Sequence, residues 1–278
     1  ARQLADSLVP STMELSGNDP VFVLPGADLD AVARALAFGL RLNGSATCIA
    51  PRRVFVPHTL AAELERALAG CVAAIPPAAV PLPVRRRLVG LVRAAVAEGA
   101  RPVGSLPKDA DPAMAPLIVA DARPGMALLR EELFAPILSL VPVRDMEEAL
   151  EAAAASPYAL GASVFGPEEE ARALAGRLDA GTVTVNDLIV PTADPRLPFG
   201  GRRASGWGVT RGAEGLLEMT RVKTVAVRRG RRLPHTDPPR DGDAALMLAA
   251  LRLLHGGPGT RAGAFRTLIQ ALRDRRTD

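Results

Sequence analysis

Short apolar runs and helix-forming segments alternate between residues 137 and 185. The apolar runs have the length of buried strands, and the helical segments carry acidic residues in their first turns, where the helix dipole favours negative charge. The second helix opens with Pro167 and three glutamates and ends before Gly181. This alternation predicts an α/β fold, a parallel sheet covered by helices. The expected strands are residues 137–143, 162–165 and 182–185, and the expected helices are residues 145–155 and the segment from 167.

The first half of the chain follows the same pattern. An apolar run at residues 21–24 ends in a Pro25-Gly26 turn, and Asp28 is placed to cap a helix that reaches about Leu42. A further strand is expected at residues 54–56, and helices at residues 60–69 and 87–98, joined by a proline-rich linker. Near the C-terminus, a Gly-rich stretch at residues 198–215 is expected to form loops, and residues 244–254 and 261–273 have helical spacing of apolar residues.

The net charge of +4 comes from the C-terminal end of the chain. Residues 228–278 contain eleven arginines and five acidic residues, so residues 1–227 carry a small negative charge. The chain has nine aromatic residues, too few to favour a base-stacking surface, and no nucleic-acid partner is expected. The apolar faces of the tail helices are short, which favours packing against protein over contact with a membrane surface.

Cysteine usage and the N-terminus indicate a cytoplasmic protein. Cys48 and Cys71 are too few for a disulfide framework, and the chain does not open with a signal-peptide pattern. The uncharged run at residues 67–84 has nearly the length of a membrane span, but four prolines exclude a continuous helix there. Sequence motifs for zinc, phosphate-loop and hydrolase-elbow sites are missing, so no metal is predicted.

Cys48 ends a loop of small residues, 43–48, between a predicted helix and a predicted strand. Such a loop leaves a thiol accessible to a substrate, and the nearby Arg52 and Arg53 are expected to favour the thiolate. The alternative is a structural cysteine that behaves as a small buried apolar residue. Cys71, in an apolar run, fits that alternative.

Glu14 is an acid within a strand-like segment, residues 12–17. It is either a surface carboxylate on a sheet edge or a buried one. Burial would raise the pKa of the carboxyl group and allow Glu14 to act as a base near neutral pH.

Six short motifs follow one another over residues 13–206. They are residues 13–20 (MELSGNDP), 43–48 (NGSATC), 131–136 (EELFAP), 156–161 (SPYALG), 181–186 (GTVTVN) and 198–201 (PFGG) with Ser205-Gly206. In this order they resemble the ELGG-type motif, the nucleophile loop, the EExFGP motif, the SPYGL segment and further motifs of aldehyde dehydrogenases. Six ordered motifs are far more specific than one, and the resemblance covers about residues 1–228.

The resemblance implies an aldehyde dehydrogenase-like catalytic domain that oxidises an aldehyde to a carboxylic acid with NAD or NADP. Cys48 would be the nucleophile, passing through a thiohemiacetal and a thioester. Glu14 would activate the water that hydrolyses the thioester. Glu132 would hold the nicotinamide ribose, Phe134 would pack near the nicotinamide ring, and Asn186 would lie close to the substrate.

The resemblance also implies how the chain is divided. The family's cofactor domain lies mainly upstream of the Glu14 motif, so the chain is expected to be part of a longer enzyme or a truncated protein. Residues 1–17 would be a remnant of the cofactor-binding domain, and residues 18–220 the catalytic domain. Residues 221–229 would be an oligomerisation strand, with residues 222–227 extending the sheet of a neighbouring subunit in a homo-oligomer. Residues 230–278 would be a basic linker and a helical tail.

Two other functions remain open from the sequence. A non-catalytic aldehyde dehydrogenase-like subunit would keep the fold and the oligomer contacts without turnover; the missing cofactor segment favours it, and the presence of Cys48, Glu14 and Glu132 opposes it. A cofactor-free hydrolase of activated esters would need Cys48 and Glu14 alone.

Overall fold

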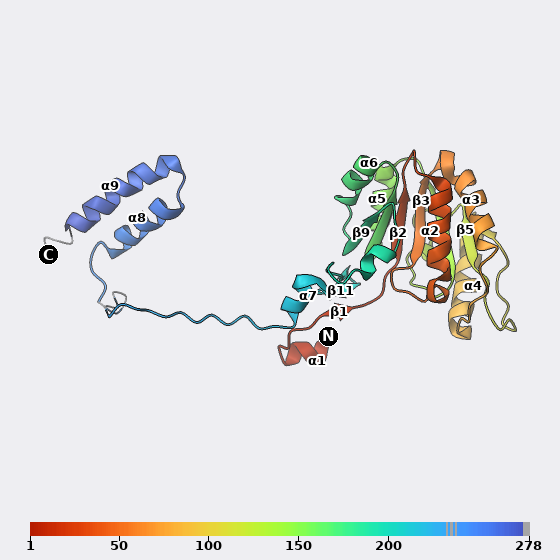
Figure 1. The fold of residues 1–278 in the computed structure, drawn as a ribbon, viewed down its shortest axis with the longest axis horizontal. Coiled ribbons are helices and arrows are strands. Elements are labelled where there is room, and N and C mark those ends of the chain that lie inside the picture. Colours follow the sequence, from red (N-terminus) through yellow and green to blue (C-terminus); the bar gives the residue numbers. More distant parts are fainter. Residues whose placement is uncertain (232, 234–235, 237, 275–278) are drawn as a thin grey trace. The chain divides into compact units, whose positions relative to one another are not determined.

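The computed structural model describes residues 1–231, 233, 236 and 238–274. The chain separates into two compact units, Ala1–Arg221 and Val222–Asp278 (Figure 1). Part of the expected linker (residues 232, 234, 235 and 237) and the end of the expected tail (residues 275–278) lie outside the described residues. Within the described part of the chain, no helix has the length and apolar character needed to cross a membrane.

A seven-stranded sheet forms the centre of the first unit, in the order β4-β5-β6-β3-β2-β8-β9. All neighbouring strands are parallel except β4, which runs antiparallel to β5 at one end of the sheet. The predicted α/β fold is therefore confirmed. The strands are β2 (Asp19–Val23), β3 (Pro51–Pro57), β4 (Arg101–Val103), β5 (Leu117–Ala120), β6 (Ile137–Val143), β8 (Gly161–Phe165) and β9 (Thr182–Val185).

Alternate residues of the strands face two different hydrophobic cores. Phe22 and Phe55, whose ring centroids are 5.4 Å apart, face one core, whereas Val21 and Val54 face the other. This period of two is a property of extended backbone and lets a helical layer cover each face. The Val21 core is closed by α2 (Leu29–Arg41) and α3 (His58–Val72), and the Phe22 core by α4 (Leu82–Ala97), α5 (Met146–Ala154) and α6 (Glu168–Ala175).

Local sequence explains most of the helix ends. Asp28 caps α2 by accepting a hydrogen bond from the Ala31 N–H at 3.0 Å, as predicted, and Asp145 caps α5 in the same way. The helix expected from residue 87 begins at Leu82 instead, because Pro83 lies in the first turn, where its missing N–H costs no hydrogen bond. The short strands β4 and β5 were not predicted from the sequence.

Two short antiparallel ribbons lie beside the main sheet. One pairs β1 (Met13–Glu14) with β11 (Gly206–Trp207), and the other pairs β7 (Tyr158–Ala159) with β10 (Arg202–Arg203). The Gly-rich stretch expected to form loops thus contains two strands and the start of α7 (Gly212–Glu218). Three 3₁₀ segments complete this unit: η1 (Leu42–Ser45), η2 (Ala127–Leu129) and η3 (Val190–Ala193). A short helix, α1 (Arg2–Asp6), opens the chain.

The second unit contains α8 (Asp243–His255) and α9 (Pro258–Asp274), which confirms the two predicted tail helices. Residues 222–227 form no strand within the single chain. Their predicted pairing with a neighbouring subunit stays a prediction. Val222 is 96% exposed, and Val225 and Val227 are also exposed. The physical reason is that β-branched alternation supplies only the side-chain pattern of a strand, while the strand itself needs a neighbouring backbone to pair with.

Candidate active site

The loops that precede β2, β3 and β6 meet at one edge of the main sheet. Parallel strands share a common N-terminal edge, and β3 lies between β2 and β6. Asp19 is the first residue of β2, Cys48 lies three residues before β3, and Glu132 lies five residues before β6. This adjacency brings Cys48 and Glu132 to the same edge, although 84 residues separate them in the sequence.

Cys48 ends a tight loop. Asn43, Gly44 and Ser45 all have positive φ angles, and the Asn43 amide group donates to the Ala46 carbonyl at 3.0 Å. At Gly44 a Cβ atom would lie 2.9 Å from the Cβ of Ala78, so glycine suits both the backbone angle and the space. The small residues noted in the sequence thus serve a sharp turn that leaves Cys48 half-buried.

The surroundings of Cys48 disfavour the thiolate. Burial raises the pKa of the thiol first, and the carboxyl groups of Asp19 and Glu14 raise it further; the backbone N–H groups of Cys48 and Ile49 lower it only in part. The expectation that Arg52 and Arg53 favour the thiolate is therefore wrong. Both guanidiniums turn into the interior, where they donate to backbone carbonyls.

Asp19 is a buried carboxyl group that the sequence analysis did not single out. Desolvation raises its pKa to about 7, against the opposing effects of the Gly161 N–H and the charges of Arg53 and Arg52. The Gly161 N–H donates to Asp19 at 3.1 Å. A Cβ at Gly161 would lie 2.2 Å from a carboxylate oxygen of Asp19, so only glycine leaves room for this carboxyl group. The sequence signal that could have identified Asp19 is an acidic residue at the start of an apolar strand.

Glu14 lies on the β1–β11 ribbon with its side chain exposed. The Thr210 hydroxyl donates to its carboxylate, and the opposite residue is Gly206, where a Cβ would lie 1.9 Å from the Met13 carbonyl oxygen. Of the two options left by the sequence, the edge carboxylate is confirmed and the buried one is wrong. Glu14 is still near enough to Cys48 for its charge to raise the pKa of the thiol.

The segment that contains Glu132 and Phe134 is fixed at both ends. Asn18 donates through its side chain to the Leu129 carbonyl at 2.9 Å, and Arg52 donates to the Ala135 carbonyl at 2.7 Å. Within the described residues, Oε1 of Glu132 is buried and has no hydrogen-bond partner. Phe134 leaves 42% of its surface exposed. An unpaired carboxylate oxygen beside an exposed ring suits a sugar hydroxyl and an aromatic ring, the two groups that a nicotinamide riboside presents.

Asn186 does not lie at this edge, which corrects its expected place near the substrate. It follows β9, at the opposite, C-terminal edge, where its side chain accepts from the Gly166 N–H and donates to the Gly166 carbonyl, both at 2.9 Å. The chain then returns: Leu188, Ile189 and Thr192 line a small cavity together with Ile49 and Asp19. Asn186 itself therefore lies away from Cys48, but the segment that follows it reaches Ile49, the residue after Cys48.

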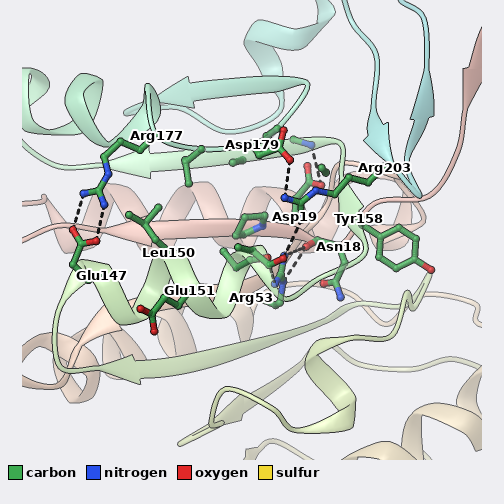
Figure 2. A pocket seen from close by; sticks show the side chains of 18 residues that line it. Asn18, Asp19, Arg53, Glu147, Leu150, Glu151, Tyr158, Arg177, Asp179 and Arg203 are labelled. Atoms are coloured by element: carbon green, nitrogen blue, oxygen red, sulfur yellow. Dashed lines mark hydrogen bonds and ion pairs between the residues drawn. The ribbon is translucent and has the colours of Figure 1, made fainter.

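A larger cavity of about 430 Å³ lies between α5, β8 and the ribbon of β7 and β10 (Figure 2). Its charged side chains are mostly paired: Arg177 with Glu147 at 2.6 Å, and Arg203 with Asp179 at 2.7 Å. Asp19 and Arg53 line its inner side. The sequence analysis did not predict this cavity, because its walls come from segments that are distant along the chain.

Comparison with known proteins agrees with this arrangement. The sequence pattern described as the aldehyde dehydrogenase family matches residues 1–225. The succinate-semialdehyde dehydrogenase [NADP(+)] of Deinococcus radiodurans is 35% identical over 227 residues, which are 77% of this chain and 47% of that enzyme. The structure of a Mycobacterium tuberculosis aldehyde dehydrogenase complexed with NAD+ has a TM-score of 0.76 at 27% identity, over 84% of this chain and 51% of that one.

A third similar protein is the NADP-dependent glyceraldehyde-3-phosphate dehydrogenase of Bacillus halodurans, whose structure was solved with NADP. Its TM-score is 0.73 at 27% identity, over 79% of this chain and 48% of that one. The chain thus spans about half the length of the relatives it matches, and these relatives use NAD or NADP. By the extent of the family match and the shared fold, the chain belongs to the aldehyde dehydrogenase family.

Proposed function

We propose that this chain carries the nucleophile and the base of an NAD(P)-dependent aldehyde oxidation. The observation that supports the proposal most strongly is the position of Cys48, half-buried in a tight loop at the sheet edge that it shares with the Glu132 segment, and near enough to Glu14 for that carboxylate to raise the pKa of the thiol. A thiol between a carboxylate that can activate water and a carboxylate without a hydrogen-bond partner suits acyl chemistry next to a bound cofactor.

In the proposed reaction the Cys48 thiol gives its proton to solvent water, and Sγ adds to the aldehyde carbonyl carbon to form a thiohemiacetal. Hydride then leaves that carbon, with the nicotinamide as the acceptor when NAD or NADP is bound, and a thioester remains. Glu14 removes a proton from water, and the resulting hydroxide attacks the thioester carbonyl. The carbon–sulfur bond breaks and releases the carboxylic acid, and the Cys48 thiolate takes back a proton from Glu14, which returns both groups to their initial states.

Two groups of this chain fit the NAD(P) that the reaction needs. The partnerless Oε1 of Glu132 is free to accept a ribose hydroxyl, and the exposed face of Phe134 offers an apolar surface to the nicotinamide ring. We also propose a homo-oligomer in which residues 222–227 pair with a neighbouring subunit, and a cytoplasmic location. Residues 1–17 as the end of the cofactor domain, and 18–220 as the catalytic domain, remain predictions of the family resemblance.

The test is an assay of nicotinamide reduction with an aldehyde and NAD or NADP, on the chain alone and joined to the half of a related enzyme that this chain does not span. We expect turnover in the joined protein and its abolition by Cys48→Ala. Cys71→Ser is the matched control and is expected to retain activity, because Cys71 lies on α3 and lines a separate pocket with α2 residues such as Arg34 and Phe38. If Cys48→Ala and Cys71→Ser had equal turnover, Cys48 could not be the nucleophile.

Glu14 has its own test in the joined protein. Glu14→Gln is expected to slow steady-state turnover by about a hundredfold or more, the usual contribution of a general base. A burst of reduced nicotinamide, equal to the enzyme concentration, should remain because the steps before hydrolysis do not use Glu14. Loss of the burst together with turnover would assign Glu14 to an earlier step.

The surroundings of Cys48 give the non-catalytic alternative a specific observation in its favour, since they raise the pKa of the thiol. Alkylation near neutral pH separates the two functions. We expect Cys48 in the 278-residue chain to react no faster than Cys71, and to react faster in the joined protein with the cofactor present. Slow labelling of Cys48 in both forms would support the non-catalytic subunit.

A further inference from the structure

Arg52 places a buried cation between the two loops of the candidate site. Only 7% of its surface is exposed. One terminal nitrogen donates to the Ser45 hydroxyl at 2.9 Å and to the Ala135 carbonyl at 2.7 Å, and the other donates to the Ser45 carbonyl at 2.6 Å. A longer contact of 3.3 Å reaches the Ile137 carbonyl. Ser45 lies three residues before Cys48, and Ala135 lies three residues after Glu132.

Burying this cation is unfavourable. Desolvation lowers the pKa of Arg52 to about 10, and the charges of Asp19 and Glu132 oppose that effect. An apolar residue would fill the same volume without the desolvation cost. A planar guanidinium, however, presents several donors in a fixed geometry, which a lysine ammonium group cannot reproduce. We therefore infer that position 52 requires the planar shape of the guanidinium group and not its positive charge.

We propose that Arg52 is a positioning residue that fixes the Cys48 loop relative to the segment of Glu132. The proposal rests on the proposed function in assigning catalytic tasks to the two loops, but the contacts of Arg52 exist independently of those tasks. Without the guanidinium, the carbonyls of Ser45 and Ala135 lose these donors, and the hydrogen bonds through which Arg52 joins the two loops are lost.

Arg53 provides a matched control on the same strand. It is 3% exposed, and its guanidinium donates to the Asn18 carbonyl at 3.0 and 2.7 Å and to the Ala153 carbonyl at 3.5 Å. Arg53 is thus as deeply buried as Arg52 and also donates to carbonyls, but it contacts neither Ser45 nor Ala135. Its removal costs stability without separating the two loops.

The first test is hydrogen exchange measured on peptides of the 278-residue chain, and it needs no enzymatic activity. The reporters are the hydrogen-bonded amides of Ala46 and Ala50 in one loop and of Ala135 and Ile137 in the other. Arg52→Met is expected to accelerate exchange at both loops by about tenfold or more, the effect of losing charge-assisted hydrogen bonds. Arg53→Met should leave the Ala46 and Ala50 amides at the wild-type rate.

Acceleration at one loop only, or equal acceleration in Arg52→Met and Arg53→Met, would overturn the proposal. If Arg52→Met does not fold, Ser45→Ala takes its place: it removes one acceptor of Arg52 and should accelerate exchange in the Cys48 loop more than in the Glu132 segment. Arg52→Lys keeps the charge but not the planar shape, so exchange should remain fast at both loops. Full protection in Arg52→Lys would show that charge alone suffices and contradict the proposal.

In the joined enzyme, Arg52→Met is expected to change two kinetic constants, each through a different loop. We expect Arg52→Met to raise KM for the cofactor, through Glu132, and to lower kcat, through Cys48. Ser45→Ala should lower kcat with little change in the cofactor KM. If Arg52→Met accelerates hydrogen exchange at both loops but no form of the joined enzyme turns over, the role of Arg52 is supported and the proposed function is refuted. A failure of the Arg52 proposal and a failure of the proposed function therefore give different results.

Discussion

The units Ala1–Arg221 and Val222–Asp278 bury different kinds of side chain. In the first, large residues such as Phe22, Phe55 and Leu36 are completely buried on the two faces of the sheet. In the second, the buried residues of the described part are Ala249 and Ala264, while Phe265 is 53% exposed. Since the hydrophobic effect grows with the apolar area removed from water, the first unit has its own source of stability and the second has little.

Three independent properties change near the same place in the sequence. The first compact unit ends at Arg221, the family match ends at residue 225, and the excess of arginine begins at residue 228. The basic net charge of the chain is therefore a property of the tail. It carries no information about the candidate site, whose charged residues lie in the slightly acidic first unit.

The largest difference in stability between the two units should appear when a phenylalanine is replaced by alanine in each. Phe55→Ala is expected to lower the free energy of unfolding by about 3–5 kcal/mol, because it opens a cavity in a closed core. Phe265→Ala should change it by about 0.5 kcal/mol or less, as expected for an exposed side chain. Urea denaturation followed by circular dichroism measures both. A large loss in Phe265→Ala would show that the tail is covered by something, such as a second copy of the chain.

Asp19 should make the stability of the first unit depend on pH. Its pKa is about 7 in the folded protein and near 3.8 when unfolded, so the folded state keeps a proton that the unfolded chain releases. The contribution of Asp19 to the free energy of unfolding thus falls as pH rises from about 4 to about 7, by on the order of 4 kcal/mol, and it stays constant above pH 7. Asp19→Asn should remove this fall. Parallel stability curves for both proteins between pH 5 and 8 would contradict the assignment.

Replacing a buried arginine should also cost more stability than replacing an exposed one, although the difference is smaller than for the two phenylalanines. Arg53→Met leaves the Asn18 carbonyl without its donor and is expected to cost about 1–3 kcal/mol. Arg266→Met, on an exposed position of α9, should cost about 0.5 kcal/mol or less. Thermal unfolding of both variants at one pH provides the comparison, and equal shifts in Tm would mean that the tail arginine has a buried partner.

Removing the tail should have the smallest effect on the first unit. A chain of residues 1–227 is expected to unfold within about 2 °C of the full chain, since that unit supplies its own core. The shortened chain should keep the pH dependence attributed to Asp19 but lose retention on a cation exchanger at low salt, because residues 228–278 supply the positive charge. A large fall in Tm would show that the two units depend on each other.

Much of the fold was predictable because its signals are local. Residues 137–185 show the alternation of strands and helices, and Asp28 and Asp145 mark helix starts through their own side chains. β4 and β5 were missed because three or four residues, one of them Pro102, carry too little pattern; their pairing with a neighbour defines them. Residues 222–227 show the opposite case: they have a strand pattern, but within the single chain they have no neighbouring backbone to pair with.

The candidate site was predictable from local sequence and from the family resemblance. Cys48 and Glu14 stood out in their own segments, Glu132 was identified from a motif, and the geometry adds what neither contains: the burial of Asp19 and the inward direction of Arg52. Both depend on contacts across the chain, such as the hydrogen bond between Arg52 and the Ala135 carbonyl. The error on Asn186 has the same origin, since a motif gives the order of residues and not the edge of the sheet at which they lie.

The hydrogen bond from Thr210 to Glu14 joins residues that are 196 positions apart. During synthesis, Glu14 leaves the ribosome early, and Thr210 and its strand partner Gly206 follow only when most of the chain has been made. Closing so long a loop is slow compared with forming the helices and the neighbouring strands of the sheet. The central sheet can therefore assemble first, and the carboxylate that would activate water is secured last, so that a nascent chain has a sheet long before it has a complete site.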